Sequence, residues 1–152
     1  MNRQQFARKL IETSSGGRKI LLTKYSKLAD ASLAKIFQQI CYEIWTNEPQ
    51  KVSIISEILR ELTDLTKNPE IRAYTEWMTA IENLVSGRLE DCLHWLDKSE
   101  KNFKDLGKFQ SAAATQISKL YALALQGRYD EAVACGLQAR DVFISQGDLY
   151  SV

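Results

Sequence analysis

The residues with the greatest capacity for chemistry are three cysteines and one histidine. Cys41, Cys92 and Cys135 lie far apart in the sequence, and none belongs to a Cys-x-x-Cys pair. Metal binding and thiolate catalysis both need such groups to converge. Cys92 and His94 are two residues apart on an expected helix, so they point about 200° away from each other around its axis. We therefore expect buried packing roles for the cysteines, an exposed His94, and a protein that is not an enzyme and uses no metal and no cofactor.

Two further clusters invite a chemical interpretation. Ser14 to Lys19 resembles a phosphate-binding loop only in its glycines and lysine, because the full P-loop spacing is missing and no strand precedes it. We interpret this stretch as a flexible link between two helices. The acidic pairs Glu90–Asp91 and Asp130–Glu131 are expected in first turns of helices, where carboxylates interact favourably with the helix dipole. This interpretation is favoured over metal binding.

Composition limits the classes of partner. The 152 residues are 45% hydrophobic, enough for one domain with a real core, and the net charge of +1 gives no field that would gather nucleic acid or an anionic membrane. Residues 1–29 hold seven Lys/Arg and one Glu, which indicates a solvated basic helix pair or, alternatively, a docking arm for an acidic partner. No apolar run is long enough for a membrane span, no signal-peptide core is present, and the cysteines read as reduced thiols. We expect a cytoplasmic location.

The elements that would position these residues are all helical. With two prolines and seven glycines, the chain has few forced turns. Between the breaks, apolar residues recur at spacings of three and four, the pattern of amphipathic helices, and no sustained period of two predicts a strand. Near residues 47–49 and 68–69, an Asn is expected to cap a helix that has Pro in its first turn. Further breaks are expected at Ser14–Gly17, Asp30, Gly87, Gly107, Gly127 and Gly147.

The sequence also repeats with a period of 40. Gly87–Cys92 aligns with Gly127–Ala132, and Phe103 aligns with Phe143. The other half of the unit recurs three times, with Phe37, Trp77 and Ile117 at one shared position. Each unit therefore reads as two antiparallel helices whose apolar stripes must be covered by the next pair. This register predicts that Trp77 and Phe103 are buried.

The turn Gly127–Ala132, G-R-Y-D-E-A, resembles the G-x-Y-x-x-A signature of tetratricopeptide (TPR) repeats. The resemblance implies a right-handed α-solenoid of antiparallel helix pairs that acts as a protein-interaction scaffold. Three features depart from the family pattern: Ile81 stands where a small residue is usual, the unit is longer than in most TPRs, and residues 47–67 lack a glycine turn. HEAT-like pairs therefore remain an alternative.

A second resemblance concerns the N-terminal region. Arg18 to Ile36 is similar to the segment that opens the TPR region of some bacterial CHAT-domain (caspase-like) proteins. It implies an alternative function, the regulatory or sensor segment of a larger enzyme whose catalytic domain follows. Residues 1–29 are expected to form capping helices, and residues 30–152 three TPR-like pairs plus the start of a fourth at 148–152. We expect a fragment of a longer array that exposes Val133, Leu137 and Ile144 and self-associates through that end.

TPR geometry implies that the first helix of each pair lines a concave binding face. The residues expected on this face are a mixture of polar and apolar types, and they lack a Lys/Asn/Arg clamp for a terminal carboxylate. We therefore expect an extended or helical protein segment as the ligand. Alternatively, the inner face is solvated and closed by flanking domains, and Trp45 is either a recognition residue or part of the core. The residues of this expected face are Lys35, Gln38, Tyr42, Trp45, Thr75, Met78, Glu82, Thr115 and Ser118.

Overall fold

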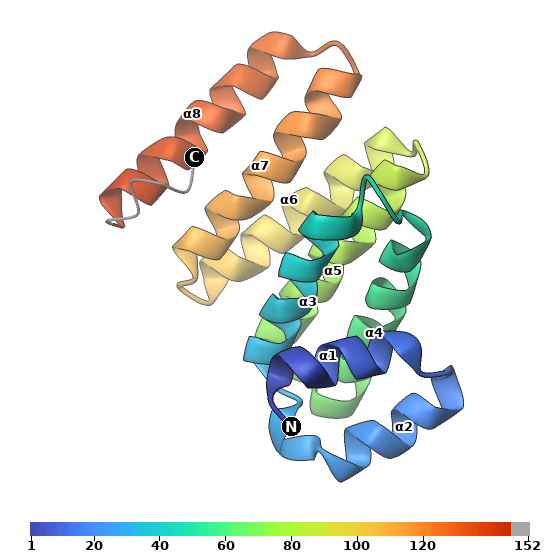
Figure 1. Cartoon of the computed structure of the whole chain (residues 1–152). Helices are drawn as coiled ribbons and strands as arrows, with labels where there is room; N and C mark the ends of the chain where they lie inside the picture. Colours follow the sequence, from blue (N-terminus) through green and yellow to red (C-terminus); the bar gives the residue numbers. More distant parts are fainter. Residues whose placement is uncertain (147–152) are drawn as a thin grey trace. The chain divides into compact units, whose positions relative to one another are not determined.

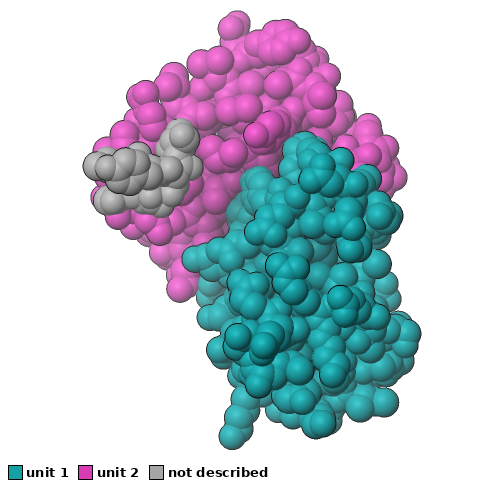
Figure 2. Space-filling model, viewed as in Figure 1, with its two compact units in different colours: residues 1–78 teal, residues 79–152 magenta. Residues whose placement is uncertain are grey.

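The computed structural model describes residues 1–146 and is all-α, 84% helical, with helices packed mainly against their neighbours (Figure 1). The chain divides into two compact units, residues 1–78 and 79–152 (Figure 2). Across the described residues, the elements in chain order are α1 (Arg3–Glu12), α2 (Ser15–Lys24), a 3-10 turn η1 (Ser26–Leu28), α3 (Ala31–Ile44), α4 (Gln50–Thr66), α5 (Pro69–Val85), α6 (Leu89–Asp105), α7 (Phe109–Leu125) and α8 (Tyr129–Ser145).

In the first unit, α1 packs against α3 and α4. Phe6 and Leu10 on its inner side are fully buried. Asp30 joins the helices by two interactions, since one carboxylate oxygen accepts from Arg3 Nε at 2.9 Å and also from the Leu33 N–H at 3.1 Å, which caps α3. The hydrogen bond from Arg3 lowers the pKa of the Asp30 carboxyl. The expected cap at Asp30 is confirmed.

Arg18 fastens α2 to α4. Its guanidinium is buried, with Nη2 2.9 Å from Glu57 and 3.0 Å from Glu61, while Nη1 donates to the Thr13 carbonyl at 3.0 Å. The expectation of a flexible link over Ser14–Lys19 is therefore wrong, because α2 begins at Ser15 and contains both glycines. The ion pairs to α4 outweigh the poor helix propensity of glycine.

In the second unit, α6, α7 and α8 lie side by side, and α7 packs against both of its neighbours (Figure 1). Ala113, Ala139 and Phe143 form the core between α7 and α8. Toward α6, Lys119 Nζ lies 2.9 Å from Asp97 and Gln126 Nε2 donates to Glu90 at 2.7 Å.

The 40-residue period is confirmed in the boundaries of α5 to α8, whereas α3 and α4 begin 38 and 39 residues before α5 and α6. α5 begins at Pro69 and α7 at Phe109, and the same interval separates the starts of α6 and α8. The turns that precede α6, α7 and α8 share one geometry, with a glycine at φ 77°, 72° and 74°. In each turn the glycine N–H and the next N–H bond back to carbonyls three and five residues earlier, a C-terminal arrangement that requires a left-handed residue. These glycines are Gly87, Gly107 and Gly127.

The two Asn-Pro expectations have different outcomes. The Asn68 side chain accepts from the backbone N–H groups of Glu70 at 2.8 Å and Ile71 at 3.2 Å, with Pro69 as the first helical residue, as expected. At α4 the expectation is wrong, since Pro49 itself occupies the N-cap position. Asn47 instead closes the end of α3 through its backbone N–H, which bonds to Ile44.

Lys67 replaces glycine at the end of α4. It is the one non-glycine residue with positive φ in the described chain, at 54°. We expect Lys67→Gly to raise the free energy of unfolding by about 0.5 to 1 kcal/mol, because the left-handed conformation costs a side-chain-bearing residue about 1 to 2 kcal/mol and glycine's extra unfolded-state entropy offsets part of that gain. Urea unfolding followed by circular dichroism measures the change.

The matched control, Gly87→Ala, should change the free energy of unfolding in the opposite direction. A Cβ at Gly87 would meet nothing within 4 Å, so Gly87→Ala tests the backbone conformation alone. It should lower the free energy of unfolding by about 1 to 2 kcal/mol. A loss of stability in Lys67→Gly would show that the Lys67 side chain outweighs its backbone strain.

Candidate partner-binding surfaces

The cysteines are packing residues. Cys41, Cys92 and Cys135 are all buried, as expected. Burial raises the pKa of Cys41 to about 12 and that of Cys92 to about 12, and it also raises the pKa of Cys135. The Cys135 thiol donates to the Gln116 side-chain oxygen at 3.1 Å. None of the three environments favours a thiolate nucleophile.

We therefore expect the folded chain to resist thiol reagents. At about pH 8 a thiol with a pKa of about 12 is ionised in roughly one molecule in ten thousand, and only thiolate reacts. DTNB should leave all thiols unmodified in buffer and modify all of them in concentrated urea. Fast modification of one cysteine in the folded chain would show that its site opens.

The remaining reactive groups are dispersed. His94 is exposed on α6, as expected, with its ring against Trp95 at 5.7 Å between centroids. Within residues 1–146 no group of three or more His, Cys, Asp or Glu side chains is placed to hold a metal ion. Both acidic pairs lie in first turns, Glu90–Asp91 in α6 and Asp130–Glu131 in α8, as expected.

The expected concave face is corrected by burial. Lys35 and Tyr42 are exposed, and Trp45 and Glu82 are half-buried. The other five side chains are buried, so they do not offer a surface to a partner. For Thr75 the reason is visible, because its hydroxyl bonds to the carbonyls of Ile71 and Leu59 and so contributes to the contact between α4 and α5. The five buried residues are Gln38, Thr75, Met78, Thr115 and Ser118.

Tyr42 belongs to an aromatic cluster in the first unit. Its ring meets Trp77 edge to face at 6.1 Å, and Trp77 stacks on Tyr74 at 6.2 Å. Trp77 is buried, as expected, whereas Tyr42 retains 36% of its surface. Tyr42 is thus a partly exposed aromatic residue held in place by a buried one, and Lys35 is exposed on the same helix.

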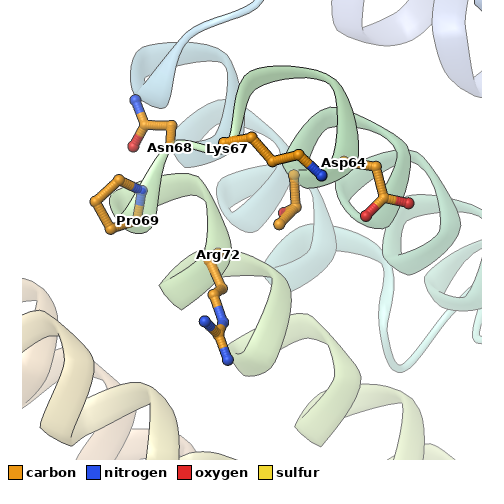
Figure 3. Close-up of a pocket in the computed structure, with 6 residues that line it drawn as sticks. Asp64, Lys67, Asn68, Pro69 and Arg72 are labelled. Carbon is orange, nitrogen blue, oxygen red and sulfur yellow. The ribbon is translucent and has the colours of Figure 1, made fainter.

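The first unit has surface pockets between neighbouring helices. One of 370 Å³ lies at the α4–α5 turn, lined by Lys67, Asn68 and Arg72 among others. In Figure 3 the Lys67 side chain extends toward Asp64, and Arg72 points away from both. The Asn68 oxygen that could receive a ligand's donor already caps α5. This pocket shows no convergent set of groups for chemistry.

A longer apolar surface lies on α8. Four large side chains, spaced at four, four and seven residues, lie on one side of the helix and are between 45% and 67% exposed. The expected exposure of three of them is confirmed. The fourth was missed because the TPR resemblance assigned Tyr129 to the turn, although its spacing to Val133 indicates one face. We call these residues the α8 apolar row: Tyr129, Val133, Leu137 and Ile144.

Equivalent positions differ in burial between repeats. Val133 is 61% exposed, whereas Leu93, 40 residues earlier, is 7% exposed. Tyr121 on α7 is 45% exposed, whereas Ile81 is 5% exposed. The pair α7–α8 therefore displays positions that are covered in preceding helices. The expected start of a further helix at 148–152 lies outside the described residues.

Among the described helices, none has the length and apolar character needed to cross a membrane. No protein-family model matches the chain, and neither does a curated protein or a solved structure.

Proposed function

We propose that this chain is a protein-interaction module of the helical-repeat class, a right-handed TPR-like solenoid that binds a protein segment without catalysing a reaction. The observation that carries the proposal is the α8 apolar row. Contiguous large apolar side chains in water are unfavourable to maintain, and such patches mark interaction sites. Tyrosine in particular supplies contact area at low entropy cost.

The corrected helix α3 surface is a second contact region for the same function. It consists of Lys35, Tyr42 and the half-buried Trp45. The support is weaker than for α8, since Tyr42 also contacts Trp77 within the unit. Both regions are open to the same experiment, which separates them.

The experiment measures binding of a partner captured by the intact chain from cell extract and then purified. Val133→Asp places a charge in the α8 apolar row and should weaken binding at least tenfold. Tyr42→Ala tests the α3 surface, and His94→Ala, at an exposed position of α6, is the matched control, expected to bind unchanged. Circular dichroism confirms helical content in each variant.

The results distinguish binding through α8 from binding through α3. Loss of binding in Tyr42→Ala alone would move the contact to α3. Unchanged binding in both Val133→Asp and Tyr42→Ala would contradict the proposal that these surfaces bind the partner.

A further inference from the structure

The helix equivalent to α8 in the preceding repeat is α6, and α7 packs against it. Two side-chain hydrogen bonds join α6 and α7: Lys119 donates to Asp97, and Gln126 donates to Glu90. Gln126 lies seven residues after Lys119 on α7, whereas Glu90 lies seven residues before Asp97 on α6, so the two helices run in opposite directions. The covering helix is therefore antiparallel. Side chains seven residues apart lie on one side of a helix, so these two bonds mark the side of each helix that faces the other.

Leu93 lies between the two acidic residues on α6 and is buried. Forty residues on, the corresponding positions on α8 are Asp130, Val133 and Leu137. Two of the three keep their character, acidic for Glu90 and aliphatic for Leu93. The third changes from a carboxylate at Asp97 to a leucine at Leu137.

We propose that the α8 apolar row docks an amphipathic helix of a protein partner, antiparallel to α8, in the position that α7 takes on α6. This inference rests on the proposed function and gives the partner its chemistry. Opposite Leu137 the partner helix carries an apolar side chain where α7 carries Lys119, because an ammonium there would lose water without gaining a carboxylate. Seven residues further along, opposite Asp130, it carries a hydrogen-bond donor, as Gln126 does for Glu90.

The chain supplies its own probe for this geometry. The probe is a fluorescent synthetic peptide of residues 109–126 with the substitution Lys119→Leu, and its control is the same peptide without the substitution. Anisotropy titration with the intact chain should show the substituted peptide binding at least tenfold more tightly. Helix-in-groove recognition predicts that the peptide gains helicity on binding.

Two chain variants test the contact directly. Leu137→Asp restores the carboxylate that α6 has at Asp97, so it should reverse the preference and favour the unsubstituted peptide. Val133→Asp should abolish binding of both peptides. Reversal requires peptide position 119 to lie against residue 137, which a non-specific apolar contact does not require.

Other results overturn the inference. Equal affinity for both peptides, or binding that survives Val133→Asp, would place the peptide elsewhere. Dimerisation by light scattering that Val133→Asp abolishes, with no peptide binding, would assign the row to a second copy of this chain. If neither peptide binds while the captured partner still depends on Val133, the proposed function stands and the helical geometry falls.

Discussion

Trp77→Ala should lower the free energy of unfolding by about 3 to 5 kcal/mol, a large fraction of the stability of a domain of this size. Trp77 is buried, so truncation leaves a cavity and removes the edge-to-face contact with Tyr42 and the stacking on Tyr74. Urea unfolding monitored by circular dichroism gives the value.

Trp95→Ala is the matched control. Trp95 is half-buried on α6, with Lys98 Nζ 5.0 Å from its ring centroid. Its truncation should cost about 1 to 2 kcal/mol, because less area returns to water. Equal losses for the two tryptophans would contradict the central position of Trp77 in the first unit.

Leu93→Asp should destabilise the chain by about 4 kcal/mol or more, whereas Val133→Asp should change stability by less than about 0.5 kcal/mol. The two positions are equivalent in the repeat, and both substitutions introduce the same carboxylate. At Leu93 the charge is buried and lies one helical turn from Asp97, while at Val133 it is solvated. Parallel urea titrations of the two variants make the comparison.

Two outcomes of these titrations would contradict the prediction. A large loss in Val133→Asp would show that Val133 belongs to the core. A small loss in Leu93→Asp would mean that α7 does not seal α6, and the template for the docked helix would disappear.

Much of the fold follows from local signals in the sequence. Glycine is favoured at positive φ, so Gly87, Gly107 and Gly127 mark three turns from residue type alone. The apolar spacing and the 40-residue repeat predict the helices, and the equivalent residues Phe103 and Phe143 are both buried. These features depend on short-range chemistry that is legible in one sequence.

The errors arise where long-range contacts decide. Arg18 is a buried residue of α2 because two glutamates 39 and 43 positions away in α4 receive it, and no local pattern announces that. Assigning one apolar stripe per helix also fails for α7, which packs on two sides and so buries Thr115 and Ser118. Small hydroxyl side chains can be buried because they donate to the helix backbone, as Thr115 does to the Ala112 carbonyl. A pattern of apolar residues alone does not predict their burial.

The shared geometry of the glycine turns bears on how such a chain can change in length. Connections within a pair and between pairs are interchangeable, since the turns at Gly87, Gly107 and Gly127 repeat the same backbone bonds. A duplication or deletion of 40 residues with both ends at these glycines rejoins the chain through a native turn. The connection at Lys67 bonds differently, to Thr63 four residues earlier. In the second unit a whole 40-residue module can therefore be gained or lost without a new kind of turn.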